Sequence, residues 1–125
     1  MEQQMENTES KDTYKVLHLI NKNPEAKTLG EHFTPITRVE EFDEKPTLKQ
    51  MQSWTDSGMI EVLTVKHEGE HRHAIIDEEG KYNNTNTPNS IATRKWWQYL
   101  KDAKYSWGND VIVGNCAVLL NFELE

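Results

Sequence analysis

The stretch GMIEVLTVKHEGEHRHAIIDEEG, from Gly58 to Gly80, decides the fold of this 125-residue chain. Met59–Lys66 is rich in aliphatic and β-branched residues, which is typical of a strand. His73–Asp77 follows after a short polar turn and has the same character. Two such runs joined by a turn predict an antiparallel hairpin, and the rest of the chain is placed relative to it.

A helix is predicted on either side of this hairpin. Thr47 is a candidate N-cap, and Gln50 completes a capping-box pattern, so we expect a helix of about ten residues that ends at Gly58. A second helix is expected to begin at Asn89 or Ser90 and to run to about Lys104.

Three further segments complete the predicted sheet. Tyr14–Ile20 carries apolar groups on both faces, which indicates a strand covered on both sides. Thr37–Glu41 is a candidate short strand, and Glu40–Lys45 is expected to be a solvated acidic loop. Val111–Phe122 is the last strand, or two strands, with a bulge or turn at Gly114-Asn115.

These elements predict an α+β fold, in which two helices pack on a mainly antiparallel sheet. We expect residues 13–125 to form one domain. Residues 1–12 contain no apolar residue except two Met, which predicts a disordered tail. Gly80 ends the acidic turn after the hairpin, and we expect it to take positive φ.

Composition limits the classes of partner. The net charge is −7, which argues against binding of duplex nucleic acid, because affinity for phosphates comes from Lys and Arg. Residues 89–125 hold four acids and four bases, so this segment repels an anionic partner least. No apolar run is long enough to span a membrane, and one Cys excludes an internal disulfide. We therefore expect no membrane contact and a cytoplasmic location.

Several short motifs resemble a family of phages and their bacterial hosts that is known only as a domain of unknown function. They are TLKQMQ and GMIEVL, then IIDEEGK, PNSIAT and DVIVGNCAVL, in that order within residues 47–122. The resemblance implies a small viral or virus-associated protein, which places it in the host cytoplasm. It implies no chemistry, cofactor or catalytic residue.

The second predicted helix offers the main candidate binding surface. At 100° per residue, Trp96 faces the core and Trp97 faces outward, surrounded by cations. An indole ringed by cations suits an anionic, nucleotide-like ligand or an acidic segment of a host protein. The candidate binding residues are Arg94, Trp97, Lys101, Lys104, Trp107 and Asn89, to which Asn84 and Asn86 are possible additions.

Each of the other candidate sites can also be explained by an ordinary structural role. Glu61 approaches Asp77–Glu79 if the hairpin pairs as predicted, and these carboxylates suit acid–base work or a divalent cation, although they are equally typical of a solvated turn. His67–His73 holds three His and two Glu, but the spacing matches no closed zinc motif. Cys116 is expected to be a buried, inert thiol.

The chain contains no motif of a known catalytic class, so we expect a non-catalytic phage accessory protein without a cofactor or metal. It would bind and inhibit or sequester a host factor, in an anti-defence or host-takeover role. The alternative is a small metal-dependent hydrolase that uses Glu61 and Asp77. The sequence also allows a homodimer.

Overall fold

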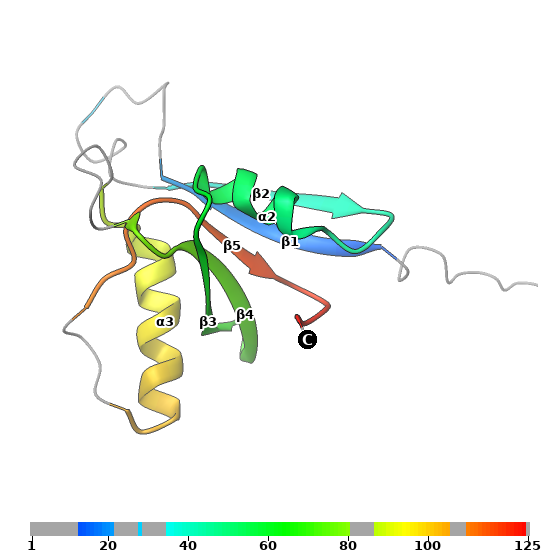
Figure 1. The fold of residues 1–125 in the computed structure, drawn as a ribbon. Helices are drawn as coiled ribbons and strands as arrows, with labels where there is room; N and C mark the ends of the chain where they lie inside the picture. Colours follow the sequence, from blue (N-terminus) through cyan, green and yellow to red (C-terminus); the bar gives the residue numbers. More distant parts are fainter. Residues whose placement is uncertain (1–12, 22–27, 29–34, 81–86, 106–109, 125) are drawn as a thin grey trace, which may run out of the picture.

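The computed structural model describes residues 13–21, 28, 35–80, 87–105 and 110–124. Across these ranges the strands form one five-stranded antiparallel sheet in the order β2-β1-β5-β4-β3 (Figure 1). The strands are β1 (Tyr14–Ile20), β2 (Ile36–Phe42), β3 (Ile60–His67), β4 (Glu70–Asp77) and β5 (Cys116–Leu119). The helices of the described part are α2 (Leu48–Thr55) and α3 (Ser90–Asp102). The predicted α+β fold is confirmed.

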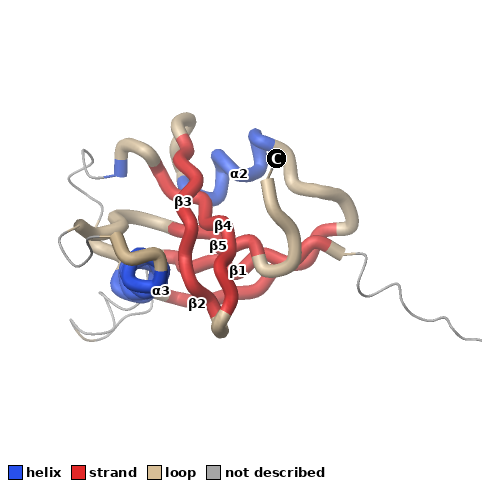
Figure 2. The backbone as a smooth tube through the Cα atoms, turned by 90° about the horizontal axis from the view of Figure 1, so that it is seen from below, coloured by secondary structure: helices blue, strands red, loops and turns tan. Residues whose placement is uncertain are grey.

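The sheet lies between the two helices (Figure 2). Successive residues of a strand point to opposite faces, and the core divides accordingly. Ala74 and Val118 belong to the cluster beneath α3, whereas Ile75 and Leu119 belong to the cluster beneath α2. The central strands β4 and β5 are therefore covered on both faces.

The hairpin that decides the fold has the predicted pairing. Ile60 lies opposite Asp77, and His67 lies opposite Glu70 at the tip. Glu68 and Gly69 both take positive φ, of 49° and 84°, which is the backbone of a type I′ turn. β4 begins at Glu70 rather than at His73, because this two-residue turn lets the strands pair up to its edge.

Two expected boundaries were wrong near α2. The acidic segment at Glu40–Lys45 is not all loop, because its first residues belong to β2 and Glu40 accepts a hydrogen bond from buried His18. α2 ends before Gly58, because Asp56 takes the left-handed conformation at φ 58° and closes the helix there.

Three other boundaries also shift. α3 ends at Asp102, and the left-handed residue after it is Lys104, at φ 64°. The last strand is shorter than expected, since it follows a turn at Gly114 (φ 92°). Gly80 does not take positive φ; a Cβ there would lie 2.6 Å from the carbonyl oxygen of Val113, so close backbone approach explains this glycine. Residues 1–12, expected to be a disordered tail, lie outside the described residues.

Buried Asn89 joins the elements around α3. Its Oδ1 accepts from the Ala92 N–H and caps the helix, while its Nδ2 donates to the carbonyls of Leu19 and Gly114 at 3.0 and 2.9 Å. One side chain thus satisfies backbone groups of β1, α3 and the segment before β5. An amide is needed because it both donates and accepts.

The two helix caps predict different losses of stability. Thr47→Ala removes an exposed capping box and should cost about 1 kcal/mol. Asn89→Ala removes a cap and two hydrogen bonds to buried carbonyls, so we expect about 3 kcal/mol or more. Urea unfolding of the two variants measures both values. Asn89→Asp keeps the capping oxygen but removes the Nδ2 donor. If this variant lowers the free energy of unfolding by no more than Thr47→Ala does, the proposed role of Asn89 is contradicted.

Candidate functional site

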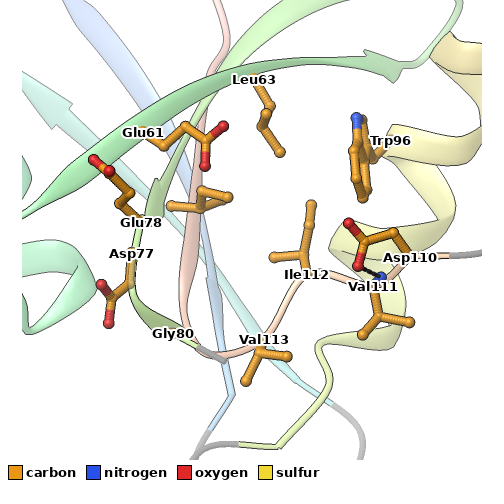
Figure 3. Close-up of a pocket in the computed structure, with 11 residues that line it drawn as sticks. Glu61, Leu63, Asp77, Glu78, Gly80, Trp96, Asp110, Val111, Ile112 and Val113 are labelled. Carbon is orange, nitrogen blue, oxygen red and sulfur yellow. Dashed lines mark hydrogen bonds between the residues drawn. The ribbon is translucent and has the colours of Figure 1, made fainter. Parts of the chain in front are cut away.

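A cavity of about 390 Å³ opens between the start of β3, the end of β4 and α3 (Figure 3). Its aliphatic floor comes from Leu63, Ile76 and Ile112, and the ring of Trp96 stands across the cavity from Glu61. The residues that line it are Glu61, Leu63, Ile76, Asp77, Glu78, Gly80, Trp96, Asp110, Val111, Ile112 and Val113. We call this cavity the acidic pocket, since every ionisable residue in that set is an acid.

Hairpin register brings two of the acids to the pocket. Ile60 pairs with Asp77, and the Glu78 N–H donates to the Met59 carbonyl, so the turn after β4 lies beside the start of β3. Glu61 and Asp77 are both among the residues that line the pocket. Their carboxylates do not converge, because Glu61 lies opposite Ile76 on the α3 face, whereas Asp77 follows Ile75 on the α2 face and points away from the cavity in Figure 3.

The far wall of the pocket is fixed to α3. The Trp97 Nε1–H donates to the Asp110 carbonyl at 2.7 Å, and the Ile112 N–H donates to the Thr93 hydroxyl at 2.9 Å. The Asn89 N–H donates to the Ile112 carbonyl at 2.7 Å. Segment 110–113 is therefore held along the helix, and the pocket is preformed.

The four carboxylates differ in how far local bonds engage them. One oxygen of Asp77 accepts from the Glu79 N–H, and one oxygen of Asp110 accepts from the Val111 N–H, each at 2.9 Å. The side chains of Glu61 and Glu78 are exposed, and their carboxylates have no hydrogen-bond partner among the described residues. A cation in the pocket would thus meet the carboxylate of Glu61, which points into the cavity in Figure 3.

The described residues show neither a cluster of metal ligands nor a nucleophile with an adjacent base at the pocket. Among the described residues no group of three or more His, Cys, Asp or Glu lies close enough to hold a metal ion. The pocket lining has no Ser, Cys, His or Lys, so a nucleophile with an adjacent base is missing from it. Its chemistry is that of a cation receptor with an aromatic wall.

The predicted basic surface of α3 is partly assembled. Arg94, Lys101 and Lys104 are exposed, as expected for the outward face. Trp97 is half-buried rather than open, and its indole N–H is used by segment 110–113. Trp107, Asn84 and Asn86 lie outside the described residues.

Asn89, also expected at that surface, is wholly buried and serves as the cap and latch described above. Sequence reasoning missed Trp96 and Asp110 as site residues. The alternation of Trp96 and Trp97 placed Trp96 in the core stripe, but no local pattern shows that its ring borders a cavity. For Asp110, the one signal in the sequence is its position two residues before Ile112, which is buried in the structure.

The three His of the hairpin have separate partners, so they do not converge on a metal. His67 Nδ1 accepts from Lys95 Nζ at 2.8 Å, and His71 Nε2 lies 3.3 Å from Asp102. His73 Nδ1 accepts from the Leu124 N–H at 3.2 Å. Burial, and secondarily the charge of Lys95, lowers the pKa of His67.

Cys116 is buried, as predicted, and burial raises the pKa of its thiol to about 12. It lies in the core beneath α3 with Val118. A thiol with so high a pKa carries negligible thiolate at neutral pH and is inert.

Comparisons with models of known protein families, with curated proteins and with solved structures give no match. The site is therefore interpreted from its own geometry. In the described part of the chain, no helix has the length and apolar character needed to cross a membrane.

Two histidines should give the protein a defined pH dependence. Burial lowers the pKa of His18, despite its hydrogen bond to Glu40, and the pKa of His67 is lowered as well, both from 6.5. The unfolded chain then binds more protons, so the free energy of unfolding should fall as the pH drops through about 6.5 toward the folded-state values.

NMR titration of the imidazole signals tests this assignment. His67 should titrate below 6.5, and Lys95→Met should raise its pKa by removing a neighbouring cation. A His67 pKa above 6.5, or one insensitive to Lys95→Met, would contradict the geometry.

Proposed function

We propose that this protein is a non-catalytic phage accessory protein that binds and inhibits or sequesters a host factor. The observation that carries the proposal is the preformed acidic pocket, in which carboxylates and an indole surround an aliphatic floor without any basic side chain. Such a lining favours capture of a ligand group and provides no reaction step for it.

The chemistry of the pocket favours a cation on an aliphatic stem. Carboxylates attract an ammonium or guanidinium group, and the Trp96 face adds a cation–π contact. The floor of Leu63, Ile76 and Ile112 suits methylene groups. A Lys or Arg side chain of a host protein has both parts, and about 390 Å³ accommodates one such chain within the usual range of ligand pockets.

The basic face of α3 supports an additional contact with an acidic partner segment. Arg94 and Lys101 are exposed on the helix that carries Trp96, and Lys104 is exposed just after its end. Opposite charges on adjacent surfaces fix the orientation of a partner more than they raise affinity. A small nucleotide-like anion is the alternative ligand for this face.

The phage origin and the host cytoplasm rest on the sequence resemblance within residues 47–122. An accessory protein that acts by occupying a host surface needs a stable fold and one selective pocket.

A metal-dependent hydrolase remains the second candidate because Glu61 and Asp77 line the same pocket. Titration with Mn²⁺, followed by paramagnetic broadening of the Trp96 indole signal, tests it. Broadening at micromolar Mn²⁺ that both Glu61→Gln and Asp77→Asn remove would favour this candidate. If Mn²⁺ causes no such broadening, the hydrolase candidate is eliminated.

The cation-receptor proposal predicts a selective response to small probes. N-acetyl-arginine amide and N-acetyl-lysine amide should shift the Trp96 indole N–H signal at millimolar concentration, because carboxylates and ring both contact the cation. Glu61→Gln and Glu78→Gln together should weaken binding about tenfold or more. Glu44→Gln with Glu123→Gln is a matched control, with the same charge change at exposed positions outside the pocket.

An anionic probe distinguishes the two surfaces. If adenosine monophosphate shifts the Trp97 signal while the cationic amides leave Trp96 unchanged, the ligand belongs to the basic face and the pocket assignment is wrong.

A further inference from the structure

The outer edge of β2 has backbone groups and aliphatic side chains that could pair with another strand. β2 is the terminal strand of the sheet, and no described segment pairs with its outer side. Ile36 and Val39 are 37% and 54% exposed there. An edge of seven residues with exposed aliphatic groups is a template for another strand.

The direction of the backbone groups along this edge follows from the hydrogen bonds that β1 makes on its other side. Lys15 directs both its N–H and its carbonyl toward the β5 side, where they bond Asn121 and Leu120. Alternation along β1 then turns the groups of Val16 toward β2, where Val16 pairs with Glu40. In β2 itself, the groups of Glu40 therefore face β1, and those of its neighbour Val39 face outward.

We propose that a second copy of this chain pairs with this edge, β2 against β2, in antiparallel register with Val39 opposite Val39. This register is the one in which outward-facing groups meet outward-facing groups at the two-fold axis. Thr37 then lies opposite Glu41 of the second copy, and these positions also have outward N–H and carbonyl groups, so the ladder is continuous.

The side chains of β2 are self-complementary in that register. Arg38 lies opposite Glu40 of the second copy, and the two-fold axis repeats this ion pair. Ile36 lies opposite Phe42 on the same face, and both are apolar. Opposite-charge and apolar cross-strand pairs stabilise antiparallel strands, whereas a shift by two residues would place Arg38 opposite Arg38 or Glu40 opposite Glu40.

The same pairing also buries apolar surface on the opposite face of the sheet. Val39 and Leu17 line an open groove of about 420 Å³ on the face that carries α3, beyond the reach of the helix over β3. Two Val39 side chains would lie side by side at the axis and cover each other. The pairing therefore removes the most exposed aliphatic residue of the strand from water.

Sedimentation velocity over a range of protein concentrations tests the interface. The wild-type chain should form a reversible dimer. Arg38→Glu should weaken dimerisation about tenfold or more, because it sets Glu opposite Glu at two symmetric places. Lys49→Glu is the matched control, since it makes the same charge change on exposed α2 and should leave the dimer intact.

A mixing experiment tests the register itself. Arg38→Glu and Glu40→Arg chains should each be monomeric, yet an equimolar mixture should dimerise, because every position 38 then meets an opposite charge at position 40. Because Glu40→Arg also removes the acceptor for buried His18, circular dichroism first checks that this chain is folded. Native mass spectrometry distinguishes the mixed dimer from either homodimer. A mixture that stays monomeric while the wild type dimerises would overturn the register.

A proline variant separates pairing from folding. Val39→Pro removes an outward N–H and should abolish the dimer while circular dichroism stays unchanged. Arg38→Pro removes an N–H bonded to β1 and should destabilise the monomer as well. A wild-type chain that is monomeric at several hundred micromolar, or a Val39→Pro chain that dimerises normally, would overturn the proposal.

Discussion

The Asn89 side chain is the interaction on which the rest of the structure depends. Its amide holds the end of β1, the first turn of α3 and the turn at Gly114 in one place. Because α3 starts there, its axis is fixed over β3, and Trp96 is directed at the acidic pocket. A buried amide with every group satisfied specifies one arrangement, since no apolar residue supplies both donor and acceptor.

The pocket is a consequence of that arrangement and of the hairpin register. Pairing of Ile60 with Asp77 sets carboxylates on one side, and segment 110–113, bonded to α3, sets the other side. Gly80 lets these two walls approach, because a side chain there would meet the Val113 carbonyl. Both walls are held by hydrogen bonds to backbone groups, so the pocket is preformed.

Much of the fold follows from the sequence because local signals agree. The capping box at Thr47, the N-cap at Asn89 and the aliphatic pattern of Ile60–Val65 all predict the observed elements. The helix end at Asp56 was missed because a non-glycine residue takes the left-handed conformation there. The pocket was only half predicted: hairpin pairing placed Glu61 near Asp77, whereas Trp96 and Asp110 join them through tertiary contacts that no local pattern records.

We propose above all that the acidic pocket accepts a cation against Trp96. The most direct measurement is a high-resolution crystal structure of the protein soaked in guanidinium at a concentration well below that which unfolds it. The claim predicts an ordered guanidinium stacked on the Trp96 ring and bonded to Glu61 or Glu78. A pocket that holds only water, beside guanidinium ordered elsewhere on the surface, would contradict it.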